Sequence, residues 1–361
     1  MMYSPSALAL LLLSSITIGR VSGQCGREKT CSSFKNHKIS DQKEYYSSTT
    51  GLSGAELKAE LNSIIRGHTK YSYDCVWTAV AEADADPEDP ERVIGLYTRR
   101  SLAKRDRIGG CGSNQDGWNR EHLWAKSKGF PNKSQHAYTD IHHLFVADAS
   151  VNSIGRNNYD FQSGGVLLNT IDSSITCETC RVDVRRRTFE PPDVDNVKGQ
   201  VARSMFYMDT RYEGGDNTRV NDLVLVDEQT GRDDTNGRLG YVSELLEWHC
   251  KFPVTQRECK RNDIVQKWQS NRNPFIDRPD FVEKIWGEQF PEIFKNCKVD
   301  ANPCLSGGGT IESPPTLPTI PESPPTLPTI PESPPTLPTI PESPPSATKV
   351  RTSVYEALFH L

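Results

Sequence analysis

The sequence predicts an α+β fold, in which helices and small sheets are mixed along one folded region of about 280 residues. Three observations predict it. Apolar residues recur at helical spacing after helix-start signals, and short runs rich in β-branched and aromatic residues lie between polar segments. The end of the chain is a proline-rich repeat that cannot form a core. The folded region is therefore residues 24–304, which is long enough for one large core.

Four segments are predicted to be helices. Ser53-x-x-Glu56 and Thr255-x-x-Glu258 have the form of capping boxes, in which side chains bind the free N–H groups of a first helical turn. Apolar residues follow each box at helical spacing: Leu57, Leu61, Ile64 and Ile65 after the first, and Cys259, Ile264, Val265 and Trp268 after the second. Residues 197–211 and 241–249 also have helical patterns.

Residues 93–98 and 118–124 are predicted to be strands. The second strand leads into a polar loop that extends to Asp140. A turn from Phe145 is then expected to lead into a short helix that holds Asn152. Strand, loop and helix would bring polar side chains from three segments together.

Both ends of the chain have a recognisable composition. Residues 1–23 contain an apolar core and end in small residues, the form of a secretory signal peptide cleaved before Gln24, so the protein is predicted to be secreted and extracellular. A signal anchor is the lesser alternative, because the first residues lack positive charge. No later stretch is suited to a membrane helix. Neither membrane association nor an obligate protein partner is expected.

The segment from Ser313 to Glu342 consists of three copies of Ser-Pro-Pro-Thr-Leu-Pro-Thr-Ile-Pro-Glu, and a fourth copy begins at Ser343. With four prolines in ten residues it cannot pair its backbone, so residues 305–361 are predicted to form a disordered, extended tail. Its threonines are candidates for O-glycosylation. A Pro-x-x-Pro ligand for a recognition domain is the weaker alternative, because such domains are mostly intracellular.

The charges of the chain are nearly balanced. The chain has 42 Lys and Arg against 47 Asp and Glu; removal of residues 1–23 takes away only Arg20, which leaves 41 against 47 and a net charge of −6. A phosphate-binding protein of this composition must collect positive charge locally. Two basic runs could do so, or could be merely solvated: Arg99, Arg100, Lys104, Arg105 and Arg107, and then Arg181, Arg185, Arg186 and Arg187.

All ten cysteines lie after residue 23, and an even number in an oxidising compartment predicts up to five disulfides. Cys177-x-x-Cys180 could alternatively be half of a zinc site. No second CxxC and no suitably spaced histidine pair accompanies it, so a disulfide is predicted there.

Glu121, His122 and Asn152 are the candidate site residues. A phosphodiester is protected by its negative charge, so its hydrolysis needs a cation to neutralise developing charge and a base for the attacking water. Glu121 and Asn152 offer the hard oxygen ligands that suit Mg²⁺, and the His122 imidazole is mostly neutral at pH 7. Adjacent strand residues point to opposite faces, so Glu121 and His122 can share a site only at a bulge or a strand end. Alone, the dipeptide is more typical of an ordinary strand.

Three sequence blocks around these residues favour a functional site over an ordinary strand. Asn119-Arg120-Glu121-His122, Asp140-Ile141-His142-His143-Leu144 and Val151-Asn152-x-x-Gly155-Arg156-x-Asn158 occur in order. This ordered set resembles the signature of the endonuclease I family, secreted and periplasmic nucleases with a ββα-metal (His-Me) finger. Similar blocks continue downstream, so the resemblance covers about residues 50–290.

The resemblance implies an endonuclease that cleaves DNA, and often RNA, with little sequence preference and leaves 5′-phosphates. His122 takes the general-base role, and Glu121 and Asn152 become ligands of Mg²⁺, for which Mn²⁺ or Ca²⁺ could substitute. The fold then contains a ββα-metal finger within residues 24–304. The alternatives are a nucleic-acid-binding protein without catalysis, and an extracellular wall or matrix protein dominated by its tail.

The phosphate-binding side chain is left open by the resemblance. Some bacterial relatives carry an arginine for this purpose in an insert, whereas residues 123–151 contain none. Arg156 is favoured because it follows Asn152 by one helical turn; the other candidates are Lys126, Lys128 and Arg203. Four residues are expected to support the finger: Asn119, Asp140, His142 and His143. Asn132 begins an N-glycosylation sequon, whose glycan must point away from the cleft.

Overall fold

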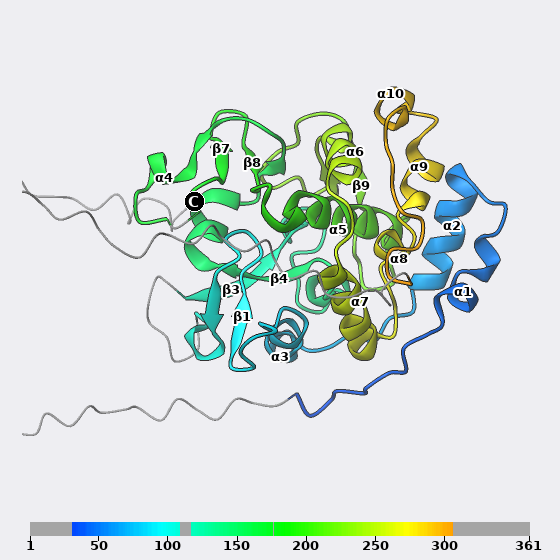
Figure 1. Cartoon of the computed structure of the whole chain (residues 1–361), viewed down its shortest axis with the longest axis horizontal. Coiled ribbons are helices and arrows are strands. Elements are labelled where there is room, and N and C mark those ends of the chain that lie inside the picture. The colour runs from blue at the N-terminus through cyan, green and yellow to red at the C-terminus, as the bar shows by residue number, and fades with distance from the viewer. Residues whose placement is uncertain (1–30, 109–116, 176, 306–361) are drawn as a thin grey trace, which may run out of the picture. The chain divides into compact units, whose positions relative to one another are not determined.

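Figure 1 shows the computed structural model of the chain, which describes residues 31–108, 117–175 and 177–305. The expected signal peptide and the tail from residue 306 onward lie outside the described residues. The described α-helices are α1 (Gln42–Tyr45), α2 (Gly54–Ile65), α3 (Tyr73–Ala83), α4 (Leu168–Ile171), α5 (Val197–Arg211), α6 (Val242–Lys251), α7 (Gln256–Gln269), α8 (Pro274–Asp277), α9 (Asp280–Trp286) and α10 (Pro291–Phe294).

The remaining elements are short. The strands are β1 (Arg92–Ile94), β2 (Ser101–Ala103), β3 (Trp118–His122), β4 (Leu144–Asp148), β5 (Asp160–Phe161), β6 (Val166–Leu167), β7 (Arg181–Asp183), β8 (Thr188–Glu190), β9 (Val224–Leu225) and β10 (Arg238–Leu239). Single helical turns of other types are η1 (Ser47–Thr49), η2 (Lys104–Asp106), η3 (Ala137–Thr139), η4 (Val151–Arg156) and η5 (Val194–Asn196). The α+β fold class predicted from the sequence is confirmed.

Helix α5 lies at the centre of the helical part (Figure 1), and all of its residues are buried. Helices α2, α6 and α8 pack against it. A helix that is enclosed on every side must satisfy its polar side chains internally. Arg203 of α5 does so by donating two hydrogen bonds to the Glu258 carboxylate, at 2.8 and 2.7 Å. That bidentate pair joins α5 to the first turn of α7.

The strands form small separate sheets. β1 pairs with β2 and β3 pairs with β4, both antiparallel, while β9 and β10 are parallel. A four-stranded sheet has the order β5-β8-β7-β6. In the β3–β4 ribbon, Glu121 lies opposite Phe145 and His122 lies opposite Leu144. Every residue of β4 is buried, and its alternate side chains enter two different hydrophobic clusters. The ribbon is therefore fixed from both faces.

The predicted helices are present as α2, α5, α6 and α7. The Thr255 capping box also forms as predicted, with the Thr255 hydroxyl accepting from the Glu258 N–H group. The Ser53 capping box does not form, because the Ser53 side chain makes no cap hydrogen bond. Gly54 has a φ of +54°, so the chain turns into α2 through a left-handed glycine and the Ser53 hydroxyl is not aligned with the helix end.

The strand predictions were partly wrong. β1 ends at Ile94, because the chain turns back at Gly95, where a Cβ atom would lie 2.9 Å from the Asp148 carboxylate. β3 ends at His122, two residues earlier than predicted. Phe145 lies inside β4 and not in a turn. The helix that holds Asn152 is present as η4, and it has π-helical hydrogen bonding.

Four disulfides join the described cysteines: Cys31–Cys75, Cys177–Cys180, Cys250–Cys297 and Cys259–Cys304. The predicted disulfide in the CxxC segment is confirmed, and the zinc alternative is excluded for this pair. Cys25 and Cys111 lie outside the described residues.

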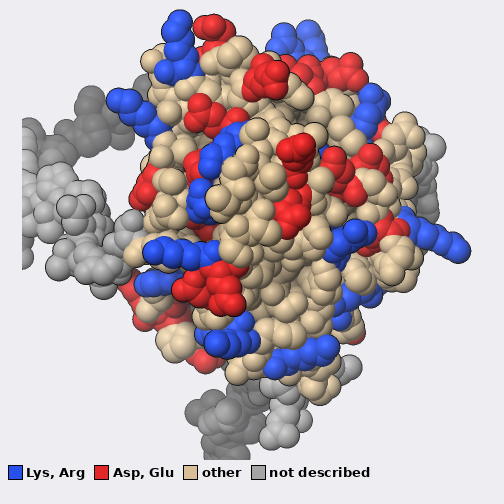
Figure 2. All heavy atoms as spheres, turned by 90° about the vertical axis from the view of Figure 1, so that its right-hand side faces the viewer, with Lys and Arg blue, Asp and Glu red and all other residues tan. Residues whose placement is uncertain are grey.

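The face made by α1, α2, α9 and α10 carries interspersed acidic and basic side chains (Figure 2). A surface of mixed sign does not attract a polyanion as a single-sign groove would. Among the described residues, no helix has both the length and the apolar character needed to cross a bilayer.

Candidate active site

The β3–β4 ribbon and η4 together have the ββα order. The chain passes from β4 into η4, whose second residue is Asn152. Asn152 Nδ2 donates to Asn119 Oδ1 of β3 at 2.7 Å, which ties η4 to the ribbon. The turn ends at Asn157, which has a φ of +35° and whose N–H group donates to the Asn152 carbonyl. The side chain of Asn152 is thus held next to β3.

Side chains alternate along β3 as a strand requires. Asn119 and Glu121 point to the side of η4, where they contact Asn152 and Arg156. Arg120 and His122 point to the side of α3, where both contact the Tyr73 ring. Glu121 and His122 thus lie on opposite faces of β3, and β3 ends at His122.

Glu121 is buried, with 2 % of its surface exposed. One carboxylate oxygen, Oε1, accepts from the Tyr97 hydroxyl at 3.1 Å and lies 3.6 Å from Arg156 Nε. The other oxygen, Oε2, has no hydrogen bond with the described residues. Burial raises the pKa of Glu121 to about 7, although Arg156 and the Tyr97 hydroxyl both oppose this change.

The site has the donor set that a hard divalent cation prefers. Glu121 Oε2 is unoccupied by protein donors, and Asn152 uses its Nδ2 toward Asn119, which leaves the amide oxygen free. These are one anionic and one neutral oxygen, which fit an ion that keeps several waters. No cluster of three or more His, Cys, Asp or Glu side chains suited to a metal occurs in the described ranges.

His122 is held by its Nε2 atom, which lies 3.0 Å from the Tyr138 carbonyl oxygen. If Nε2 carries the proton, Nδ1 is the free acceptor, and it has no hydrogen bond with the described residues. Burial, then the neighbouring His143, lowers the pKa of His122 well below its ordinary value. The ring is consequently neutral at pH 7 and able to accept a proton.

The four candidate phosphate-binding residues lie in different surroundings. Arg156 is buried: it donates to the Leu123 carbonyl at 2.7 Å and to the Tyr159 carbonyl, and it faces Glu121. Arg203 is buried against Glu258, and buried Lys128 donates to Asp160 and Thr230, both at 2.6 Å. Each of these three is buried and faces a carboxylate inside the protein, although Arg156 Nε makes no hydrogen bond. Lys126 is exposed, and its Nζ lies 3.4 Å from the Tyr138 hydroxyl, beside His122.

Of the residues expected to support the finger, Asp140, His142 and His143 are buried in the loop between β3 and β4, whereas Asn119 lies on β3 and is partly exposed. Asp140 accepts from the hydroxyls of Tyr207 and Tyr212, at 2.8 and 2.9 Å. His142 Nε2 lies 3.2 Å from the Asn271 carbonyl oxygen, and His143 Nε2 lies 2.7 Å from the Ala137 carbonyl oxygen. Burial lowers the pKa of both histidines to about 4, so neither is charged at neutral pH. The His143 ring lies 5.5 Å from that of His122.

Only part of the first basic run lies near the candidate site. Arg99 is paired with Asp195, whereas Arg107 lies over the Trp77 ring of α3, with 5.5 Å between its guanidinium carbon and the ring centroid. The second run lies on β7 and the turn before β8, where its arginines are exposed. Asn132 is exposed, and its neighbour Lys133 lies over the Tyr73 ring.

Tyr73, Tyr97 and Arg120 were missed by the sequence reasoning. Tyr97 binds Glu121, and Tyr73 contacts both Arg120 and His122. Arg120 was noted only as part of a motif. The place of Arg120 beside Glu121 in this motif was a signal that could have identified it. Its packing against Tyr73 could not be predicted, because 47 residues separate the two in the sequence.

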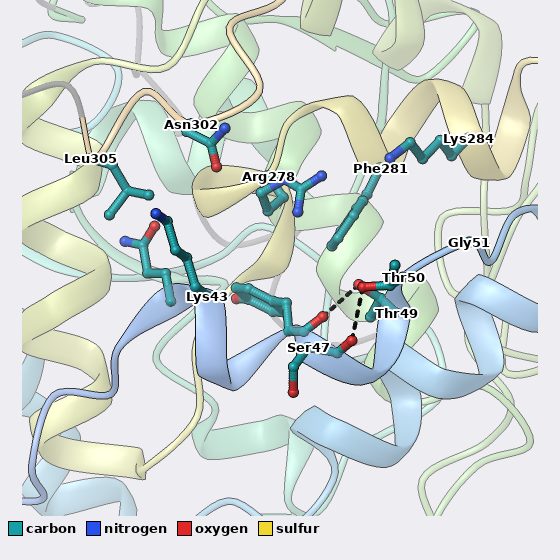
Figure 3. A pocket seen from close by; sticks show the side chains of 12 residues that line it. Lys43, Ser47, Thr49, Thr50, Gly51, Arg278, Phe281, Lys284, Asn302 and Leu305 are labelled. Carbon is teal, nitrogen blue, oxygen red and sulfur yellow. Dashed lines mark hydrogen bonds between the residues drawn. The ribbon is translucent and has the colours of Figure 1, made fainter.

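A cavity of about 290 Å³ between α1, η1 and α9 lies apart from these residues (Figure 3). Lys43, Ser47, Arg278 and Phe281 are among the side chains that line it. Arg278 is bound to Asp280, at 2.9 and 2.8 Å. The cavity contains none of the candidate site residues.

The sequence profile of endonuclease I matches residues 53–280, a span that includes β3, β4 and η4. The chain belongs to the endonuclease I family. It is 44 % identical over 255 residues to an extracellular ribonuclease of Bacillus amyloliquefaciens, which covers 68 % of this chain and 79 % of the relative. It is 31 % identical over 140 residues to an extracellular deoxyribonuclease of Aeromonas hydrophila, which covers 38 % of this chain and 49 % of the relative.

Membership of the endonuclease I family identifies the protein as an endonuclease. It is also similar to endonuclease-1 of Buchnera aphidicola, with 26 % identity over 144 residues, or 40 % of this chain and 46 % of the relative. Nucleases of the endonuclease I family depend on a metal. The substrate of this chain is accordingly a nucleic acid.

Proposed function

We propose that this protein is a secreted, Mg²⁺-dependent endonuclease that hydrolyses DNA and RNA with little sequence preference and leaves 5′-phosphates. His122 is the general base, and Glu121 and Asn152 are the metal ligands. Mn²⁺ or Ca²⁺ could substitute for Mg²⁺. The observation that carries the proposal is that β3 and the adjoining η4 carry three acceptor atoms without a hydrogen bond from the described residues: Glu121 Oε2, the Asn152 amide oxygen and His122 Nδ1.

A phosphodiester that lies across the end of β3 would have the Glu121 and Asn152 oxygens on one side and His122 on the other. The bound cation would neutralise charge that develops on the phosphate. His122 Nδ1 would accept a proton from the attacking water, because the neutral ring is held in one orientation by the Tyr138 carbonyl. Tyr97 and Arg156 would fix one Glu121 oxygen and leave the other for the cation.

Two observations support secretion. The described disulfides are typical of proteins that fold in an oxidising compartment. Two relatives, one matching 68 % and the other 38 % of this chain, are named extracellular nucleases. One is named a ribonuclease and the other a deoxyribonuclease, which supports activity on both polymers.

Replacing His122 by alanine is expected to lower kcat by about 10²- to 10⁴-fold, the usual contribution of a general base. The His122→Ala protein should still bind nucleic acid, since the charges of the surface are unchanged. The measurement is a digestion panel of single- and double-stranded DNA and RNA in Mg²⁺, with a binding assay beside it. Wild-type cleavage should stop in excess EDTA.

The matched control is His37→Ala, which removes a partly exposed histidine that contacts Thr69, far along the chain from the ribbon. It should cleave at the wild-type rate. Cleavage by His122→Ala at the wild-type rate would remove His122 from the base role. Unchanged cutting in EDTA would remove the metal from the mechanism.

A further inference from the structure

Arg120 lies beside the proposed base on the same face of β3. Two strand residues span about 6–7 Å, so Arg120 and His122 are neighbours on that face. Both contact Tyr73: the Arg120 guanidinium carbon lies 3.3 Å from the ring centroid, and the His122 ring centroid lies 5.9 Å from it. The guanidinium is therefore held close to the place where the reaction is proposed to occur.

Among the described residues, no carboxylate oxygen lies within 4.0 Å of an Arg120 nitrogen, the limit for an ion pair. The Nη1 atom donates to the Tyr73 carbonyl, whereas the Nε atom is buried without an acceptor. The side chain is partly exposed. Arg156 and Arg203, by contrast, each face a carboxylate. A partly exposed guanidinium with no counterion among the described residues is suited to bind an anion from outside, and its planar fork matches a phosphate.

Two aromatic side chains of α3 hold the guanidinium in place. Tyr73 and Trp77 are four residues apart, so they share a face of the helix. The Arg120 guanidinium carbon lies 3.3 and 3.9 Å from their ring centroids. Trp77 packs in turn on Trp118 of β3, with 5.1 Å between the ring centroids. These contacts orient Arg120 before any ligand arrives, which lowers the entropic cost of binding.

More cations flank the same two rings. Lys133 Nζ lies 5.6 Å from the Tyr73 centroid, and the Arg107 guanidinium carbon lies 5.5 Å from the Trp77 centroid. Lys133 is exposed and Arg107 is partly exposed. Positive charge therefore continues on both sides of Arg120, as binding to the regular backbone of a nucleic acid requires.

We propose that Arg120 binds a phosphate of the nucleic-acid strand adjacent to the phosphate that is cleaved. Tyr73 and Trp77 position the guanidinium for this contact. The separation of Arg120 and His122 is of the same order as that between neighbouring phosphates of a strand. The proposal rests on the proposed function, because it takes His122 as the marker of the cleaved bond.

The test measures binding in the His122→Ala background, with EDTA present, so that no cleavage occurs. A labelled single-stranded DNA oligonucleotide is titrated with Arg120→Gln and Arg120→Lys proteins over a series of salt concentrations. Arg120→Gln should weaken binding about 10-fold at low salt and reduce the slope of log K against log salt by about 0.7, the loss of one phosphate contact on a single strand. Arg120→Lys should keep most of that slope.

The control is Lys295→Gln, which removes one charge from an exposed side chain beyond α10. It should leave affinity and slope unchanged. In the protein that retains His122, Arg120→Gln should raise KM more than it lowers kcat. Thermal unfolding of each variant establishes that the fold is intact.

Unchanged affinity and slope in Arg120→Gln would overturn the proposal. Equal losses in Arg120→Lys and Arg120→Gln, with an unchanged salt slope, would also overturn it, because they would indicate packing and not charge. A wild type that fails to cleave, together with an Arg120-dependent slope in the binding assay, would refute the nuclease mechanism and leave the phosphate site supported. The two proposals can therefore fail separately.

Discussion

Asn119 shows how a single amide can prepare a neighbouring side chain for a ligand. Its Oδ1 atom accepts from Asn152 Nδ2 at 2.7 Å, so the Asn152 amide has one orientation and its oxygen stays available. Hydrogen bonds of this kind behind a metal ligand commonly change metal affinity by about 10- to 100-fold. Asn119 is therefore proposed as the residue that orients the Asn152 ligand.

Asn119→Ala is expected to raise the Mg²⁺ concentration needed for half-maximal cleavage by about 10- to 100-fold, because the Asn152 amide loses its fixed orientation. Saturating Mg²⁺ should restore most of the rate. Asn119→Asp, which keeps an acceptor, is the control and should need Mg²⁺ concentrations near those of the wild type. Identical Mg²⁺ titrations of wild type and Asn119→Ala would contradict the orienting role.

The sequence named candidate site residues but did not predict their surroundings. Glu121, His122 and Asn152 were identified from chemistry and order. The position of Arg156 one helical turn after Asn152 favoured it as the phosphate-binding residue, but tertiary packing directs its side chain to Glu121 and to buried carbonyls. Arg120 can be recognised as a phosphate-binding candidate only in the folded structure, because Tyr73 and Trp77 of α3 hold its guanidinium in position.

At the level of elements, the two expected capping boxes behave differently although their sequences are alike. At Thr255 both hydrogen bonds of the box form, and Glu258 also binds Arg203 of α5. At Ser53 no side-chain cap forms. Residues 54 and 256 explain the difference: the first is a glycine with positive φ, and the second is an ordinary helical glutamine. A capping motif predicts a helix start more reliably than it predicts the hydrogen bonds.

Thr255→Ala is expected to lower the free energy of unfolding by about 1 kcal/mol, the usual cost of losing an N-cap hydrogen bond. Ser53→Ala is the matched comparison and should change it by much less, because the Ser53 hydroxyl makes no cap hydrogen bond. Urea unfolding followed by circular dichroism measures both. Equal losses in the two variants would show that the contrast between the two helix starts is not present in solution.

β4 shows why strands were harder to predict than helices. Leu144, Phe145, Val146 and Ala147 are consecutive apolar residues, because both faces of the strand are buried. A short, fully buried strand lacks the alternation that identifies a strand from its sequence. β1 is shorter than predicted for a different reason. Gly95, which follows it, lies close to Asp148, a residue distant in the sequence. Both errors reflect tertiary packing and not local preference.

For the whole molecule, the disulfides attach the last described segment to the helical core. Cys250 of α6 is bonded to Cys297, and Cys259 of α7 is bonded to Cys304. Their sequence separations are 47 and 45 residues. Bridges over such distances restrict the unfolded chain and typically stabilise a fold by about 2–4 kcal/mol. The number of cysteines predicted disulfides, but their pairing needed the fold.

Buried histidines give the whole fold a pH dependence. Burial lowers the pKa of His68 to about 3, and burial followed by the charge of Arg203 does the same for His249. In the unfolded chain a histidine has a pKa near 6.5. Below pH 6.5 the unfolded chain therefore binds protons at these rings and the folded protein does not. Stability is fully present above pH 6.5 and falls as the pH decreases toward 3.

His249→Leu tests this linkage at one site. The substitution removes one group that binds a proton in the unfolded chain and not in the folded protein. Between pH 5.5 and pH 4, the slope of the free energy of unfolding against pH should therefore be smaller than in the wild type by about 1.4 kcal/mol per pH unit. Urea unfolding at several pH values measures the slope. His37→Leu is the comparison, and because His37 is partly exposed it should change the slope less. A His249→Leu slope equal to that of the wild type would mean that the folded protein accommodates the protonated ring.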